Sequence, residues 1–137
     1  MMASTALLPW LRACCATASQ VNCVVVAGGG DFADGVRRLQ QVHGFDDLSA
    51  HRLAIEAMAL NARMLSALCP DMPLSSSGAL SADLLPSQLW LPRDGAPEFE
   101  LSPSWEVTSD TLALALAQQL NASQLILVKS IPSIAAS

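Results

Sequence analysis

The sequence contains no tyrosine, and aromatic residues make up only 4% of its 137 residues. A surface that stacks the bases of single-stranded nucleic acid needs several aromatic rings, so such a ligand is not expected. The formal net charge of -5 and the pI near 4.7 show that the chain also lacks an excess of basic residues. Proteins that bind a phosphate backbone need a basic face. We therefore expect no nucleic-acid partner.

Long apolar runs are also absent, since no stretch approaches the roughly 20 residues that span a bilayer. The segment Ala6–Leu11 is apolar, but no basic residue precedes it and Arg12 follows it, which does not fit a secretory signal peptide. The four cysteines show no CxxC spacing and form no zinc pattern with the two histidines. We expect a cytoplasmic protein with reduced thiols, no metal site in the chain and no membrane partner.

The composition is that of a chain with a substantial core, with 52% hydrophobic and 14% charged residues. A chain of this length forms one domain and is too short for two. We expect residues 1–137 to form a single domain.

The most informative stretch is an apolar run, Val21–Ala27, that ends at the three glycines Gly28, Gly29 and Gly30. Short Val-rich runs are typical of buried parallel strands. The helix expected next, Asp31–Val42, would present unpaired N–H groups and the positive end of its dipole. Glycines at such a corner allow positive φ and let a ligand approach the backbone, so the pattern indicates a site for an anion such as phosphate or carboxylate.

Further elements follow from hydrophobic spacing and from caps. Phe32, Val36 and Leu39 form an apolar stripe that predicts the inward face of the first helix. Ser49 is the expected N-cap of a long helix that ends at Leu68. The remaining elements are a loop over Pro70–Pro86, a strand over Gln88–Leu91, a helix capped by Thr108-Ser109-Asp110, and a strand over Gln124–Lys129. This order predicts an α/β fold, a three-layer sandwich with a mainly parallel open sheet.

The glycines have more than one interpretation. Gly28, Gly30 and Ala33 match the dinucleotide pattern G-x-G-x-x-G/A, which makes a Rossmann domain an alternative. That fold places a strand after one short helix, with an acid about 20 residues on. Asp46 and Asp47 lie near that distance but precede a long helix. A Walker A loop is excluded because no Gly-Lys-Ser/Thr follows. A tight turn without a ligand is the remaining interpretation.

Three stretches resemble motifs of the amino acid kinase (aspartate/glutamate/uridylate kinase) family. Val26–Gly30 is similar to its second glycine motif, Val107–Asp110 to its aspartate motif, and Leu125–Ser130 to the strand before its nucleotide-binding loop. Gly28–Arg37 and Pro103–Asp110 are most similar to a small branch linked to tetrahydromethanopterin and methanofuran one-carbon metabolism, the aminomethylfuran phosphate kinase-like branch. The resemblance implies a kinase that uses ATP and Mg²⁺.

The resemblance also implies roles for particular residues. The glycine amides would hold the phosphate or carboxylate of a small acceptor, and Asp110 would orient the reacting groups as the catalytic residue. Supporting substrate contacts are expected from Arg37, Thr108 and Ser109, and nucleotide contacts from Lys129 and Ser130.

The sequence departs from the family pattern at both ends. The family opens with a strand ending in a Lys-Gly-Gly-Ser-like motif, which is not found here, and Ile131-Pro132 stands where Asp-Gly is expected. We therefore expect the first strand and the C-terminal nucleotide-binding part to be missing. The alternative function is an inactive remnant that acts as a binding or assembly subunit. Uncovered sheet edges and apolar helix faces predict a homo-oligomer, a dimer.

Overall fold

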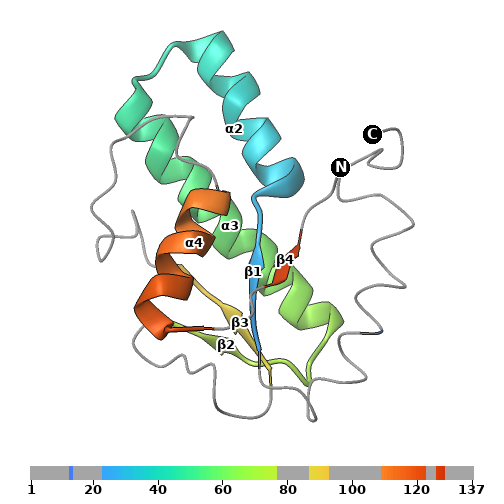
Figure 1. The fold of residues 1–137 in the computed structure, drawn as a ribbon. Coiled ribbons are helices and arrows are strands. Elements are labelled where there is room, and N and C mark those ends of the chain that lie inside the picture. The colour runs from blue at the N-terminus through green and yellow to red at the C-terminus, as the bar shows by residue number, and fades with distance from the viewer. Residues whose placement is uncertain (1–12, 14–22, 77–86, 93–108, 123–125, 129–137) are drawn as a thin grey trace, which may run out of the picture.

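The computed structural model describes residues 13, 23–76, 87–92, 109–122 and 126–128 (Figure 1). Within these ranges the chain forms parallel strands separated by helices. The elements are β1 (Val24–Ala27), α2 (Gly30–His43), α3 (Asp47–Leu68), β2 (Leu74–Ser75), β3 (Gln88–Trp90), α4 (Ser109–Leu120) and β4 (Ile126–Val128).

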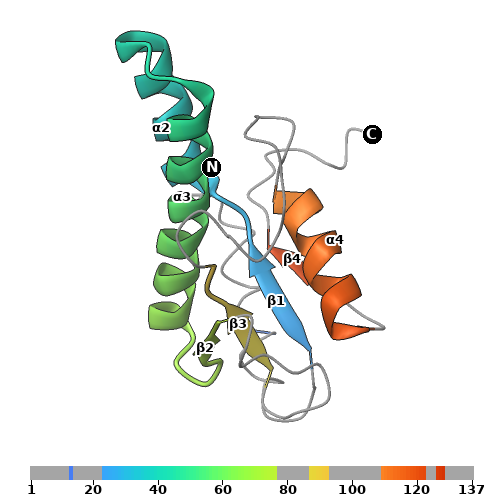
Figure 2. The same cartoon turned by 90° about the vertical axis from the view of Figure 1, so that its left-hand side faces the viewer.

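The sheet has the order β2-β3-β1-β4, and every pairing in it is parallel. Val25 of β1 is in register with Leu89 of β3 on one side and with Ile126 of β4 on the other. Figure 2 shows α2 and α3 on one side of the sheet and α4 on the other, which makes three layers. The α/β class with a parallel open sheet, predicted from the sequence, is confirmed.

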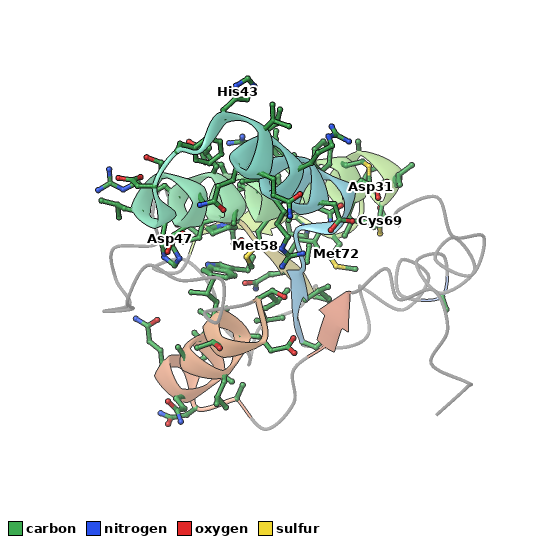
Figure 3. All side chains as sticks on the ribbon, turned by 90° about the horizontal axis from the view of Figure 1, so that it is seen from above. Asp31, His43, Asp47, Met58, Cys69 and Met72 are labelled. Carbon is green, nitrogen blue, oxygen red and sulfur yellow. The ribbon has the colours of Figure 1, made fainter. Side chains whose placement is uncertain are left out.

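The strand β1 lies between β3 and β4 and is buried on both faces, which explains its unbroken apolar sequence. Because side chains alternate along a strand, Val25 and Ala27 belong to one apolar cluster and Val24 and Val26 to another. The first cluster includes Ala62, Leu65, Cys69, Met72 and Leu89. The second includes Ile55, Met58, Trp90, Leu112, Ala113 and Leu116. Figure 3 shows Met58 on the side of α3 that faces the sheet.

The long helix begins earlier than expected, and its cap is a different residue. Asp46 is the N-cap of α3, and its carboxylate accepts a hydrogen bond of 2.8 Å from the backbone N–H of Ser49. The prediction that Ser49 is the cap is therefore wrong: Ser49 is already helical and is the partner of the cap. Its hydrogen bonds to the Asp46 carboxylate hold the pKa of that group below its usual value of 3.8.

The predicted inward stripe on the first helix is also wrong. No residue of α2 is buried, and the side chains of Phe32 and Leu39 are 39% and 45% exposed. Figure 1 shows α2 packed along α3 and extending past the end of the sheet, so α2 does not lie against the sheet as the predicted stripe required. The connection to α3 is held by Gln40, whose side-chain amide donates to the Phe45 carbonyl and to the Asp47 carboxylate.

Part of the expected loop over Pro70–Pro86 is a strand. The two residues of β2 pair with β3 through backbone hydrogen bonds from Leu89 to Pro73 and from Leu91 to Ser75. Residues 77–86 lie outside the described part of the chain. So do residues 21–22, 124–125 and 129, at the ends of two expected strands.

One of the two cysteines in the described ranges departs from the reduced state expected. Cys69 is disulfide-bonded, whereas Cys23 is a free, buried thiol 3.2 Å from the hydroxyl of Ser87. Among the helices in the described ranges, none has the length and apolar character needed to cross a membrane.

Candidate acceptor site at the glycine corner

The glycine corner, Gly28–Gly30, joins the inner strand to α2 at the carboxyl edge of the sheet (Figure 1). Gly28 is buried, and Gly29 and Gly30 are partly exposed. The backbone of Gly30 has a φ of 56°, in the left-handed region that glycine adopts without strain. The change of direction from strand to helix therefore depends on this residue type, as the sequence indicated.

The corner leaves the start of α2 without a side-chain cap. Gly29 occupies the N-cap position and has no side chain with which to accept a hydrogen bond. The first N–H groups of an α-helix have no partner within the helix, and the helix dipole adds partial positive charge there. Ala33, at the fourth position of the helix, donates to the Gly29 carbonyl at 3.2 Å, which is the first backbone hydrogen bond of α2. The arrangement suits an anionic group.

The start of α4 lies at the same edge of the sheet. Because β4 runs parallel to β1 and follows α4, the end of α4 is near the amino edge of the sheet and its start is near the carboxyl edge. Figures 1 and 2 show this placement, with α2 and α4 on opposite sides of the sheet. Ser109 opens α4, and the exposed Asp110 lies in its first turn. Two helix N-termini therefore flank the carboxyl end of the inner strand.

One polar side chain at the corner was missed by the sequence analysis. Asn61 of α3 is only 2% exposed, and its side-chain amide donates a 2.6 Å hydrogen bond to the Gly28 carbonyl. A signal was present, because Asn61 is the one carboxamide in the mostly apolar stretch Met58–Leu65. That signal alone does not reveal a partner 33 residues away.

The other predicted site residues are less close to the corner or lie outside the described ranges. Arg37 is about 10 Å along α2 from Gly30, and it forms an exposed 3.4 Å ion pair with Asp34. Its predicted contact with an acceptor phosphate stays a prediction. Thr108, Lys129 and Ser130 are outside the described residues, so their predicted roles are untested.

The described residues contain no group of three or more His, Cys, Asp or Glu side chains arranged to hold a metal ion. A dedicated protein cage is not what nucleotide-bound Mg²⁺ requires, since Mg²⁺ binds mainly to phosphates and water with one or two carboxylates. The exposed carboxylate of Asp110 at the open edge of the sheet is compatible with that kind of binding.

Comparison of the sequence with known proteins gives two matches. The sequence model of the amino acid kinase family matches residues 4–137. The chain is similar to [5-(aminomethyl)furan-3-yl]methyl phosphate kinase from Methanocaldococcus jannaschii, with 28% identity over 119 residues. The aligned region covers 81% of this chain and 53% of that protein, so the chain spans about half the length of its relative.

Proposed function

Because the chain belongs to the amino acid kinase family, we propose that it is part of an ATP-dependent phosphotransferase that acts on a small phosphorylated acceptor. The observation that carries the proposal is the pairing of two helix N-termini at one edge of a parallel sheet. One follows the glycine corner and the other carries Asp110. In open α/β sheets, ligands bind outside the carboxyl ends of the strands, which is this edge.

The two sides of the site would do different work. The backbone N–H groups at the start of α2 would hold the acceptor's anionic group, with the dipole of α2 favouring its charge. Asp110 would orient the reacting groups, with Thr108 and Ser109 supporting its turn and Arg37 near the acceptor. Catalysis of phosphoryl transfer consists mainly of positioning and charge stabilisation.

The nucleotide side is proposed from the family alone. Bound ATP would supply the phosphoryl group, and Mg²⁺ would neutralise charge on its phosphates. Lys129 and Ser130 are the proposed nucleotide contacts in this chain. The order of elements gives no support to the dinucleotide alternative, because α2 and α3 both precede the next strand, whereas a Rossmann domain has one helix there.

The acceptor class is proposed by analogy with the similar protein. That relative is named for a phosphate ester of an aminomethylfuran. The same compound is the first acceptor to test here, and a role in one-carbon cofactor biosynthesis is part of the proposal. A homodimer through the apolar surface of α3 is a further proposal, since Leu53, Leu60 and Leu68 are exposed on that helix.

The test is phosphorylation of [5-(aminomethyl)furan-3-yl]methyl phosphate with ATP and Mg²⁺, followed by ADP release and by ³¹P NMR of the diphosphate product. The expected result is a new pair of coupled phosphorus signals and stoichiometric ADP. The blocked variant is Gly29→Trp, because a side chain on Gly29 overlaps Ala33. Its matched control is Gly35→Trp, since a side chain there meets open space.

Turnover in the wild type and in Gly35→Trp, with loss in Gly29→Trp, would support an acceptor site at the glycine corner. Equal turnover in both variants would place the acceptor elsewhere. No turnover by the wild type, with no binding of ATP and Mg²⁺ in calorimetry, would favour the alternative of an inactive binding or assembly subunit.

A further inference from the structure

The peptide between Gly28 and Gly29 is held by a side chain from another element. The Gly28 carbonyl accepts a 2.6 Å hydrogen bond from Nδ2 of Asn61, a buried residue of α3 that is 33 positions away in the sequence. A glycine on each side leaves the rotation of a peptide weakly restricted, because neither residue has a Cβ to limit φ and ψ. The hydrogen bond from Asn61 is therefore what fixes the orientation of this peptide.

Asn61 occupies its position at a cost to the core. Its Oδ1 atom is buried and has no hydrogen-bond partner among the described residues. An enclosed, unpaired polar atom loses its water without compensation, which destabilises the folded state. Leucine has a similar size and would avoid that cost, since the adjacent Ala62 and the nearby Leu65 belong to an apolar cluster. The contact with the Gly28 carbonyl is thus the feature that accounts for a polar residue here.

The contact also sets the direction of the next N–H group. In a planar trans peptide the C=O and N–H bonds point in opposite directions. Because the Gly28 carbonyl points toward Asn61 on α3, the N–H of Gly29 points away from α3. Figure 2 shows α3 and α4 on opposite sides of the sheet. The Gly29 N–H is therefore directed toward the side that α4 covers.

The Gly29 N–H is a free donor within the described part of the chain. None of the described residues accepts a hydrogen bond from it, and Gly29 is partly exposed. It directly precedes the first turn of α2, whose own N–H groups have no partner within the helix. Its orientation adds one more donor to that set, provided that the peptide does not rotate.

We infer that Asn61 is a positioning residue: by holding the Gly28 carbonyl against α3, it directs the Gly29 N–H to the phosphate of the acceptor. The inference rests on the proposed function, which puts that phosphate at the glycine corner. Asn61 acts through the peptide and does not touch the ligand. Without its hydrogen bond, the Gly28 carbonyl would be buried and unpaired, and the peptide would rotate to find another donor.

The experiment is a titration of the ¹⁵N-labelled protein with methyl phosphate, followed through the amide signals of individual residues. In the wild type we expect the Gly29 signal to shift to higher proton frequency, as an N–H does when it donates to an anion. The Gly35 amide, beyond the first turn of α2, should not respond. In Asn61→Leu the Gly29 response should be lost, and the Kd should rise about tenfold, the effect of one hydrogen bond to a charged group.

A general loss of stability is controlled with Leu65→Ala, which removes a fully buried side chain one turn further along α3. That variant should lower the melting temperature and keep both the Gly29 response and the affinity. Should Asn61→Leu fail to fold, the wild-type titration decides alone. No Gly29 shift in the wild type, a shift retained in Asn61→Leu, or an equal loss in Leu65→Ala would overturn the inference.

Methyl phosphate separates this inference from the proposed function, because its binding requires neither nucleotide nor turnover. A Gly29 response that depends on Asn61, found in a protein that transfers no phosphoryl group, would refute the kinase proposal and leave the role of Asn61 standing. Turnover of the furan phosphate by a protein whose Gly29 signal does not respond would refute the role of Asn61 and leave the kinase proposal standing.

Discussion

Ala33 packs directly over the backbone of Gly29. Its N–H donates to the Gly29 carbonyl at 3.2 Å, and its Cβ occupies the space that a side chain on Gly29 would need. The first turn of α2 is therefore wound closely around a residue that must be small. This contact restricts the glycine corner independently of any ligand.

The substitution Gly29→Ala tests that contact. Because the added methyl group overlaps Ala33, either the helix start or the corner must shift, at a cost of about 1–3 kcal/mol in the free energy of unfolding. Gly35→Ala in the same helix is the matched control, since nothing lies within 4 Å of a Cβ there. It should stabilise the protein by about 0.5–1 kcal/mol. Urea denaturation measures both, and equal effects would contradict the packing described.

A second pair of variants separates backbone strain from ligand binding. Gly30 and Gly44 both have positive φ, at 56° and 69°, at opposite ends of α2. Gly30→Ala and Gly44→Ala should each lower stability by about 1–2 kcal/mol, because alanine is strained in that region. Only Gly30→Ala should also raise the KM for the acceptor. A rise of similar size in Gly44→Ala would show that the effect arises from helix stability.

Asp110 is expected to affect the rate much more than the stability. It is exposed on the first turn of α4, where a carboxylate interacts with the helix dipole by about 0.3–1 kcal/mol, so Asp110→Asn should have a modest effect on stability. If Asp110 orients the reacting groups, kcat should fall by roughly 10²–10³-fold with a small change in KM. The control is Asp71→Asn, an exposed carboxylate outside the helices. An unchanged kcat in Asp110→Asn would remove Asp110 from the mechanism.

The Asp46 cap makes a pH-dependent contribution to stability. Its pKa is lowered by hydrogen bonds from Ser49, so the ionised form is favoured in the folded state. The folded pKa lies below the unfolded one, so this contribution is present above about pH 4 and is lost as pH falls through the folded value. Asp46→Ala should therefore lower the melting temperature at pH 7 and have less effect near pH 2. A pH-independent difference from the wild type would contradict the linkage.

The end of α4 offers a stabilising change. Asn121 has a φ of 52°, and the next residue, Ala122, donates its N–H to the Ala117 carbonyl at 3.0 Å, a Schellman-type ending. Asn121→Gly should raise stability by up to about 1 kcal/mol, and Asn121→Ala should lower it by a similar amount. Thermal unfolding measures the two shifts, which should have opposite signs.

The parts of the fold predicted correctly are those determined by local sequence. The run Val24–Ala27 is apolar because the strand is buried on both faces, and the glycines after it mark the start of α2. On α4 the i, i+4 spacing of Leu112 and Leu116 matches their burial against the sheet. In these segments the apolar pattern and the buried residues that it predicts lie within a single element.

The parts that were missed depend on distant partners. The two residues of β2 form a strand only because β3 provides their hydrogen bonds. The apolar spacing in α2 is present in the sequence, but α2 packs along α3 and extends past the end of the sheet, so the stripe is not buried against the sheet. Asn61 looks like an interruption in an apolar helix until Gly28, far along the chain, is placed beside it.

The glycine corner joins two segments whose backbone amides should differ greatly in protection from hydrogen exchange. Before it lies β1, which is inner in the sheet and fully buried, and after it lies α2, which has no buried residue and packs against α3. In native-state hydrogen exchange, β1 amides should open only with global unfolding, whereas α2 amides should exchange through a local, low-energy opening. Occupancy of the helix start by an anion would then be recorded as slower exchange in α2, with no change in β1.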